Sequence, residues 1–226
     1  MNVLGIETAT TVCAAALVRG GRVISESLLD AGRVHAEKLM GQIASVLGPG
    51  GVGSLSGVAV SIGPGSFTGL RIGVSVAKGI AFAGNIPLVG VPTLEALALH
   101  AAGAARMQSG IRLLAALDAR RDEVYCQLFD VTENGPVPLW DARDMTLGAL
   151  MEELHGSEAR VTGEGAAKVL SWPGAAATLT ALRGESLRSS AGSVARLGEK
   201  LLLAGKADDP SALEPRYIKD FFLRTR

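Results

Sequence analysis

The chain has 226 residues, in which 22 Lys and Arg balance 22 Asp and Glu, and 48% of the residues are hydrophobic. This much apolar material can fill a sizeable core and excludes a mainly disordered chain. The zero net charge excludes a protein that binds nucleic acid or a membrane through its overall charge. Two cysteines, Cys13 and Cys126, indicate buried thiols in a reducing compartment, with the cytoplasm as the expected location.

Two apolar stretches resemble membrane or export segments only superficially. Residues 39–70 carry no charge, but nine glycines and two prolines in that stretch would break a helix. The apolar run at residues 12–18 follows Glu7 and has no basic residue before it, so it is not typical of a secretory signal. We therefore expect no membrane segment.

The first part of the chain alternates strand and helix patterns after an opening set of three strands. Apolar periodicity and turn residues predict strands at 3–7, 12–18, 23–29, 57–62 and 86–91, and helices at 35–47, 67–83 and 93–104. Gly20-Gly21 predicts a hairpin between the second and third strands, and the run from Gly48 to Gly51 ends the first helix.

The second part repeats this order after a polar break at residues 106–110. The pattern predicts strands at 111–117, 123–131 and 160–162, and helices at 147–154, 166–170 and 194–203. Two units that each begin with antiparallel strands predict an α/β protein with mixed sheets and two lobes, at residues 1–105 and 106–226. The second lobe is expected to be the smaller one.

The densest motif runs from Gly63 to Gly73, at a junction between a strand and a helix whose amides could bind an anion. A Walker A loop needs Lys after its last glycine, whereas Leu70 and Arg71 follow Gly69. The dinucleotide fingerprint also fails, because its third glycine comes one residue late. A turn followed by Ser66 as the helix N-cap explains the start of the motif without a ligand.

The helix after this turn is apolar around most of its circumference. Small residues recur every four positions in it, at Gly69, Gly73, Ala77 and Ala81, and would let another backbone approach closely. Its own sheet can cover one flank, and either a partner or the same domain must cover the other. Burial by a partner and burial within the same domain both remain open. If a partner covers this helix, the helix at 35–47 is its expected neighbour in the interface.

Residues for independent catalysis or metal binding are scarce. The sequence has no Gly-x-Ser-x-Gly motif, and both cysteines lie among apolar strand residues, where thiols are usually inert. His35, His100 and His155 share no spacing typical of metal ligands. His35 is better explained as a residue at the start of a helix.

With these motifs assembled, the chain resembles the bacterial TsaB (YeaZ-type) family, part of the machinery that makes threonylcarbamoyladenosine in tRNA. The resemblance spans essentially the whole chain. It depends on Ile6-Glu7-Thr8-Ala9-Thr10, on His35-Ala36-Glu37, on the run from Gly63 to Gly73, on the segment from Asp118 to Tyr125 and on Pro215-Arg216-Tyr217-Ile218. The run from Gly63 to Gly73 is highly specific, whereas the other segments are weak alone.

This resemblance implies the actin-like ATPase fold, with two similar lobes. In active relatives, an Asp and glycines after the first strand approach nucleotide phosphates, whereas Glu7 and Ala9 occupy those places here. A metal-binding His of the catalytic paralogue TsaD corresponds to Met40, so the metal site is expected to be lost. We expect no firm cofactor and at most weak ATP or ADP binding, at a vestigial site of Thr8, Thr10, Asp118, Gly163 and Gly165.

The resemblance also implies a subunit without catalysis of its own that binds and stabilises TsaD, together with the ATPase TsaE, and reaches tRNA through the complex. Such a subunit is needed for threonylcarbamoyl transfer to the adenosine beside the anticodon in tRNAs that read codons starting with A. Without its partner it is expected to form a homodimer through the same surface. The expected interface residues come from the first two helices: His35, Leu39, Met40, Ile43, Val46, Leu47, Gly69, Leu70, Ile72, Gly73, Val76, Ala77 and Ile80.

Two alternatives are enzymes: an ATP-binding kinase-like protein and a glycoprotease-type metallopeptidase. Direct tRNA contact also stays open, since Arg120, Arg121 and the basic residues of the C-terminal tail (Arg216, Lys219, Arg224 and Arg226) offer local positive charge.

Overall fold

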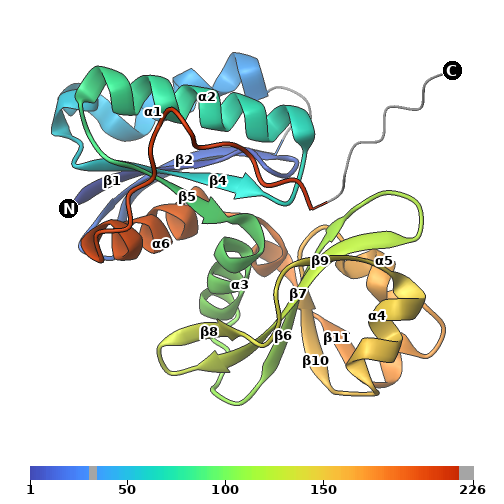
Figure 1. The fold of residues 1–226 in the computed structure, drawn as a ribbon. Helices are drawn as coiled ribbons and strands as arrows, with labels where there is room; N and C mark the ends of the chain where they lie inside the picture. Colours follow the sequence, from blue (N-terminus) through green and yellow to red (C-terminus); the bar gives the residue numbers. More distant parts are fainter. Residues whose placement is uncertain (31–34, 219–226) are drawn as a thin grey trace, which may run out of the picture.

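The computed structural model describes residues 1–30 and 35–218, apart from the side chain of His35, and each of its two lobes is built on one sheet (Figure 1). The first sheet has the order β3-β2-β1-β4-β5, and the second has the order β11-β10-β6-β7-β8, with β9 also paired to β7. In both sheets, an antiparallel hairpin is extended on one side by parallel strands. The expected pair of similar α/β lobes with mixed sheets is therefore confirmed.

The elements follow the chain in two runs that match the predicted alternation. The first run comprises β1 (Asn2–Glu7), β2 (Val12–Arg19), β3 (Arg22–Asp30), α1 (His35–Leu47), β4 (Gly57–Gly63), α2 (Phe67–Gly84), β5 (Leu88–Pro92) and α3 (Thr93–Ala104). The second run comprises β6 (Arg112–Asp118), β7 (Glu123–Thr132), β8 (Gly135–Pro138), β9 (Arg143–Thr146), α4 (Leu147–Leu154), β10 (Ala159–Thr162), α5 (Ala166–Leu170), β11 (Leu179–Ala181) and α6 (Ala191–Leu203). Short 3-10 turns lie at Gly48–Gly50, Val52–Ser54, Ala175–Ala177 and Gly184–Leu187.

The first sheet is buried on both faces because its central strands are apolar at nearly every position. Leu4 and Ile6 of β1 point to the face that α1 and α2 cover, and they share a core with side chains of both helices. Val3 points to the opposite face, where α6 packs. Side-chain alternation along β1 thus supplies both layers of the lobe. Figure 1 shows α1 and α2 on one face of this sheet and α6 on the other.

The second sheet is likewise sandwiched between helices. Leu114 and Ala116 of β6 pack with α4 and α5, whereas Leu113, Ala115 and Leu117 of the same strand pack with α3. Strand β6 therefore plays the part in the second lobe that β1 plays in the first.

Two helices cross the predicted boundary between residues 105 and 106. Helix α3 comes from the first run but packs on β6 and β8 of the second sheet, and α6 comes from the second run but packs on β1, β2 and β4 of the first sheet. Close backbone contact fixes α6 there, because a Cβ at Gly5 would lie 2.2 Å from the carbonyl oxygen of Ala191. The linear division misassigns these helices because sequence shows that a helix needs an apolar partner but not which sheet provides it.

The segment after α6 also returns to the first lobe. The amide of Asp208 donates to the carbonyl of Leu88 on the edge strand β5 at 2.8 Å, and the amide of Arg216 donates to the carbonyl of Ile62 at 2.7 Å. Leu213 between them is only 8% exposed and joins the core under α1 and α2. The tail thus covers the free edge of β5.

Three strands have no counterpart in the sequence prediction: β8, β9 and β11. They contain four, four and three residues, and β8 includes two prolines. Such short edge strands carry too few residues to show alternation of apolar and polar side chains, so only pairing in the folded sheet reveals them.

Candidate functional site

The expected interface residues lie on α1 and α2, which contact each other on one face of the first sheet (Figure 1). Most of them point into the lobe's own core rather than outward. The buried ones are Leu39, Ile43, Val46, Leu47, Gly69, Leu70, Gly73, Ala77 and Ile80. The expectation that these side chains form an external surface is therefore wrong, because the apolar face of the sheet takes them up. The side chain of His35 lies outside the described residues.

The small-residue stripe of α2 is an internal packing surface. A Cβ at Gly69 would lie 2.0 Å from the carbonyl oxygen of Thr8, and a Cβ at Gly73 would lie 2.2 Å from the Oγ1 of Thr8. That Oγ1 donates a hydrogen bond of 2.8 Å to the carbonyl of Gly69. The glycines let α2 approach the end of β1, and Ala77 and Ala81 continue the contact into the core.

Four apolar side chains on the same two helices stay exposed or half-buried. We call Met40, Ile72, Val76 and Phe82 the outer α1–α2 face: Met40 is 55% exposed, Phe82 is 88% exposed, and the other two are half-buried at the edge of the core. A phenylalanine this exposed gains almost nothing from its own lobe. The sequence prediction named the other three residues and missed Phe82.

A second group of candidate residues surrounds the turn that follows β1. The backbone amides of this turn are already paired with side-chain oxygens of the chain itself. The pairs are Thr8 with Ser61 Oγ (3.4 Å), Ala9 with Glu7 Oε1 (2.6 Å), Thr11 with Glu164 Oε1 (2.8 Å) and Val12 with Thr10 Oγ1 (3.2 Å). Two of the four acceptors are carboxylates, one from each lobe.

Glu7 is fully buried at the end of β1. Burial raises the pKa of its carboxyl group to about 7, although the Ala9 amide and the Ser61 hydroxyl favour the charged form. Its Oε2 has no hydrogen-bond partner in the described part of the chain. Nearby Glu164 adds a small repulsion that raises the pKa further.

The loop Gly163–Glu164–Gly165 approaches this turn from the second lobe. A Cβ at Gly163 would lie 2.2 Å from the carbonyl oxygen of Ala116, and a Cβ at Gly165 would lie 3.0 Å from the carbonyl carbon of the same residue. The amide of Gly165 also donates to the Ala116 carbonyl at 2.9 Å. These glycines therefore allow the loop to pack on β6, which explains their presence without a nucleotide.

Asp118 ends β6, and Lys168 of α5 forms an ion pair with it. Burial is the largest single effect on the pKa of Asp118 and raises it, but the hydrogen bond from Lys168, the amide of Arg120 and the charge of Lys168 together lower the pKa below its usual value. Arg120 and Arg121 form the exposed hairpin tip and have φ angles of 74° and 48°. Thus Asp118 already has a cationic partner within its own lobe.

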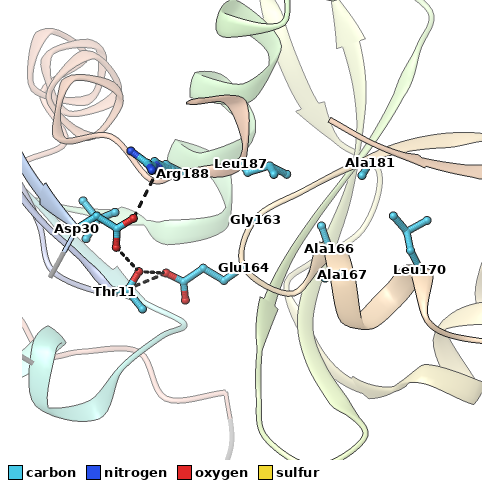
Figure 2. Close-up of a pocket in the computed structure, with 11 residues that line it drawn as sticks. Thr11, Asp30, Gly163, Glu164, Ala166, Ala167, Leu170, Ala181, Leu187 and Arg188 are labelled. Atoms are coloured by element: carbon cyan, nitrogen blue, oxygen red, sulfur yellow. Dashed lines mark hydrogen bonds and ion pairs between the residues drawn. The ribbon is translucent and has the colours of Figure 1, made fainter. Parts of the chain in front are cut away.

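A cavity of about 430 Å³ lies between the two lobes at this turn (Figure 2). Its walls are mostly aliphatic, with Ala167, Leu170 and Leu187 among the lining side chains. The polar lining residues join in one chain of contacts: Thr11 Oγ1 donates to Glu164 at 2.7 Å and contacts Asp30 at 3.1 Å, and Asp30 lies 3.6 Å from Arg188 Nε.

The residues at this turn do not fit a nucleotide phosphate. An incoming phosphate would have to displace the carboxyl groups of Glu7 and Glu164 from the amides, and the negative charge of Glu164 would repel it. Three residues of the vestigial site already have partners. The Thr8 hydroxyl donates to a carbonyl of α2, the Thr10 hydroxyl accepts from the Val12 amide, and Asp118 forms an ion pair with Lys168. Each is engaged in the fold, and no chemical step through a bound nucleotide follows from this geometry.

Other reactive groups are buried or dispersed. Burial raises the pKa of Cys126 to about 12 and also raises the pKa of Cys13, so both thiols stay protonated near neutral pH. Within residues 1–30 and 35–218, no three His, Cys, Asp or Glu side chains gather closely enough to hold a metal ion. Among those same residues, no helix is long and apolar enough to cross a membrane.

Sequence reasoning missed Asp30, Glu164 and Arg188, which connect the two lobes. The loop around Glu164 was identified only through its glycines, and the carboxylate between them carried no separate signal. Phe82 was missed because it directly follows the buried residues Ile80 and Ala81 in the chain, although helical spacing places it in line with Ser75 and Lys78.

Comparisons with known proteins find two related kinds of protein, TsaD and TsaB. The family model described as TsaD, tRNA N6-adenosine threonylcarbamoyltransferase, matches residues 29–140. The tRNA threonylcarbamoyladenosine biosynthesis protein TsaB of Escherichia coli (strain K12) is 30% identical over 227 residues, which cover 97% of this chain and 95% of that protein.

Two solved structures are similar to this chain over most of its length. YeaZ from Pseudomonas aeruginosa has a TM-score of 0.83 at 26% identity, covering 96% of this chain and 99% of that one. The ethanolamine utilization protein EutJ from Carboxydothermus hydrogenoformans has a TM-score of 0.51 at 11% identity, covering 88% and 90% of the two chains, and is similar in fold alone. The expected α/β fold of the actin-like ATPase type is confirmed.

Proposed function

Because this chain belongs to the TsaB family of tRNA threonylcarbamoyladenosine biosynthesis proteins, we propose that it serves this tRNA modification as a subunit without catalysis of its own. In this proposal it binds and stabilises a TsaD-like protein through the outer α1–α2 face. Catalysis resides in that partner, which transfers the threonylcarbamoyl group to the adenosine beside the anticodon of tRNAs that read codons starting with A.

The exposed ring of Phe82 is the observation that carries this proposal. It is 88% exposed on α2, next to a helix that presents Met40 at 55% exposure. A partner that covers these side chains would remove a large apolar area from water, and aromatic anchors of this kind dominate many protein interfaces. The interface is therefore expected on the opposite side of α2 from the glycine stripe.

The TsaD-like identity of the partner is supported by the extent of the family match. The TsaD model matches residues 29–140, which include α1, α2 and α3. A TsaD-like protein is thus expected to carry a related pair of helices. Two related helix pairs can pack against each other with approximate two-fold symmetry, and the same surface would allow two copies of this chain to associate when the partner is absent.

The proposed assembly also includes the ATPase TsaE, and tRNA is reached through the complex. In the described part of the tail, Arg216 is an exposed cation and Tyr217 accepts a hydrogen bond of 3.2 Å from Arg71 at the start of α2. Lys219, Arg224 and Arg226 lie outside the described residues. Because the net charge of the chain is zero, we assign tRNA binding to the whole assembly rather than to this chain alone.

The test replaces Phe82 with Glu and measures affinity for the TsaD-like partner by isothermal titration. The F82E variant should bind at least tenfold more weakly, since a charge would be buried in the interface, which corresponds to about 1.4 kcal/mol. The control is Leu203→Glu on α6, because Leu203 is also an exposed large apolar residue, at 69%. Equal affinity of F82E and the unaltered chain would contradict the proposed surface.

The functional role is tested by reconstitution. Purified TsaD-like protein, TsaE, threonylcarbamoyl-adenylate and tRNA are combined with and without this chain, and modified adenosine is measured by mass spectrometry. Modification should depend on the chain and should fall with F82E but not with Leu203→Glu. Full modification without the chain would refute the proposal, and ATP hydrolysis by the isolated chain would instead favour the kinase-like alternative.

A further inference from the structure

At the rim of the cavity, the carboxylate of Glu164 makes a direct contact between the two lobes. Oε1 of Glu164, from the second lobe, accepts hydrogen bonds from both the amide and the hydroxyl of Thr11 in the first lobe, at 2.8 and 2.7 Å. Figure 2 shows these two dashed contacts spanning the space between the lobes. Hydrogen bonds to a charged acceptor are stronger than those between neutral groups. Both residues are exposed, so solvent reduces the contribution of each bond, and the two bonds act together as the link.

The Glu164 side chain is presented from a rigid support. Both neighbouring glycines lie against Ala116 of β6, where a Cβ would overlap the backbone, and the Gly165 amide is bonded to the Ala116 carbonyl. Gly163 has a φ of +95°, which non-glycine residues rarely adopt. The loop is thus held on β6, and its carboxylate points across to the turn after β1.

The receiving side has the character of an anion site. An amide and a hydroxyl that converge from one turn bind anions readily, because their positive ends point at a common place. In this chain the common place is filled by Glu164. Two residues before Thr11, the amide of Ala9 donates a hydrogen bond of 2.6 Å to the carboxyl group of Glu7, which belongs to the first lobe.

We propose that Glu164 is an internal anion that latches the two lobes together at the turn after β1, so that the closed arrangement needs no bound ligand. The latch comprises Thr11 on one side and Glu164 on the other. Asp30 extends it, since it contacts the Thr11 hydroxyl and pairs with Arg188 in the segment that leads back to α6. The Asp30 to Arg188 pair is largely exposed and adds little by itself.

The latch would act in addition to α3 and α6, which contact each other and also join the two lobes. A ligand that bridges two lobes holds them closed only while it is bound, whereas a side chain is present at an effective concentration set by the fold. Removing the carboxylate should therefore loosen the lobes, and an added small anion should restore the closed arrangement.

The experiment measures the distance between spin labels on the two lobes by pulsed electron resonance. Labels are placed by Ala44→Cys on α1 and Glu152→Cys on α4, both exposed positions, and the native cysteines are buried. The labelled chain is compared with its Glu164→Ala form and with a matched control, Glu158→Ala. Glu158 is an exposed glutamate of the same lobe for which the described residues provide no ion pair or hydrogen bond.

The labelled parent and its Glu158→Ala form should give one narrow distance distribution. The Glu164→Ala form should show a broader distribution with a longer-distance population, and sodium acetate should narrow it again while sodium chloride of equal ionic strength should not. An unchanged distribution in Glu164→Ala would overturn the latch. A broadening that acetate cannot reverse would overturn the internal-anion role.

Circular dichroism checks that Glu164→Ala is folded. If it is not, the same distance measurement is made on Glu164→Gln. This variant keeps an acceptor oxygen at the same place but has no charge, so it should broaden the distribution to a smaller extent. A distribution identical to that of the parent would then overturn the proposal that the charge matters.

Discussion

The inward position of the glycine stripe can be tested by adding one methyl group to α2 at two places. At Gly69 the new Cβ would lie 2.0 Å from the carbonyl oxygen of Thr8, whereas at Gly79 it would meet no atom within 4 Å. Both positions lie in the same helix, between Phe67 and Gly84. Gly79 lies in the helix interior and Gly69 in the first turn, so Gly69→Ala gains at most the helix propensity that Gly79→Ala gains, and the main difference between the two changes is packing.

The magnitudes follow from these distances. Replacing an exposed helical glycine by alanine stabilises by about 1 kcal/mol, so Gly79→Ala should raise the melting temperature by about 2–4 °C. At Gly69 a backbone atom must move by more than 1 Å, which places the overpacking cost near the upper end of its usual range, at about 3 kcal/mol. The net loss of about 2 kcal/mol should lower the melting temperature by about 4–8 °C.

Urea unfolding followed by circular dichroism measures both free energies in one buffer. The expected result is opposite signs for the two variants relative to the unaltered chain. Equal stabilisation by Gly69→Ala and Gly79→Ala would refute the inward packing of the stripe and would return it to the outside of the lobe.

Two further predictions concern carboxylates. Burial raises the pKa of Glu7 from 4.5 to about 7, so the folded chain binds this proton more tightly than the unfolded chain does. The free energy of unfolding therefore falls as pH rises from about 4.5 to 7, by about 3 kcal/mol in total. Glu7→Gln should remove this decline, and parallel pH profiles of urea unfolding for the two chains between pH 5 and 8 would contradict the assignment. Glu26 of β3 accepts hydrogen bonds from Ser190 Oγ at 2.9 Å and from the Gly192 amide at 3.0 Å, at the start of α6. Glu26→Ala should lower the free energy of unfolding by about 1–2 kcal/mol, measured by thermal or urea unfolding. Glu26→Gln keeps an acceptor oxygen, so an equal loss in both variants would show that the hydrogen bonds are not responsible.

Much of the fold could be predicted from local pattern. The helix over Phe67–Gly84 follows from Ser66, which caps it by accepting from the Gly69 amide at 3.2 Å, and from the apolar residues after it. The hairpins that open the two lobes follow from paired apolar runs around Gly20-Gly21 and around Asp118 to Glu123. These signals are local in the chain, so they survive without knowledge of the tertiary structure.

The orientation of α2 could not be predicted in the same way. A helix with small residues on one side and large apolar residues on the others fits both an external and an internal contact. Only the position of Thr8 at the end of β1 shows that the glycines face inward, and that Phe82 is left at the surface. The candidate interface therefore changed from the stripe to the opposite side of the same helix.

By itself, the sequence determined the alternation of strands and helices, the two similar units, the mixed sheets and the family resemblance, because all of these depend on residue type and spacing along the chain. The tertiary structure decided which sheet α3 and α6 cover, which face of α2 is exposed, and that Glu164 meets Thr11 across 153 positions. Contacts of this kind depend on how lobes pack in three dimensions. A single glutamate between two glycines gives no periodic signal of the partner it will find.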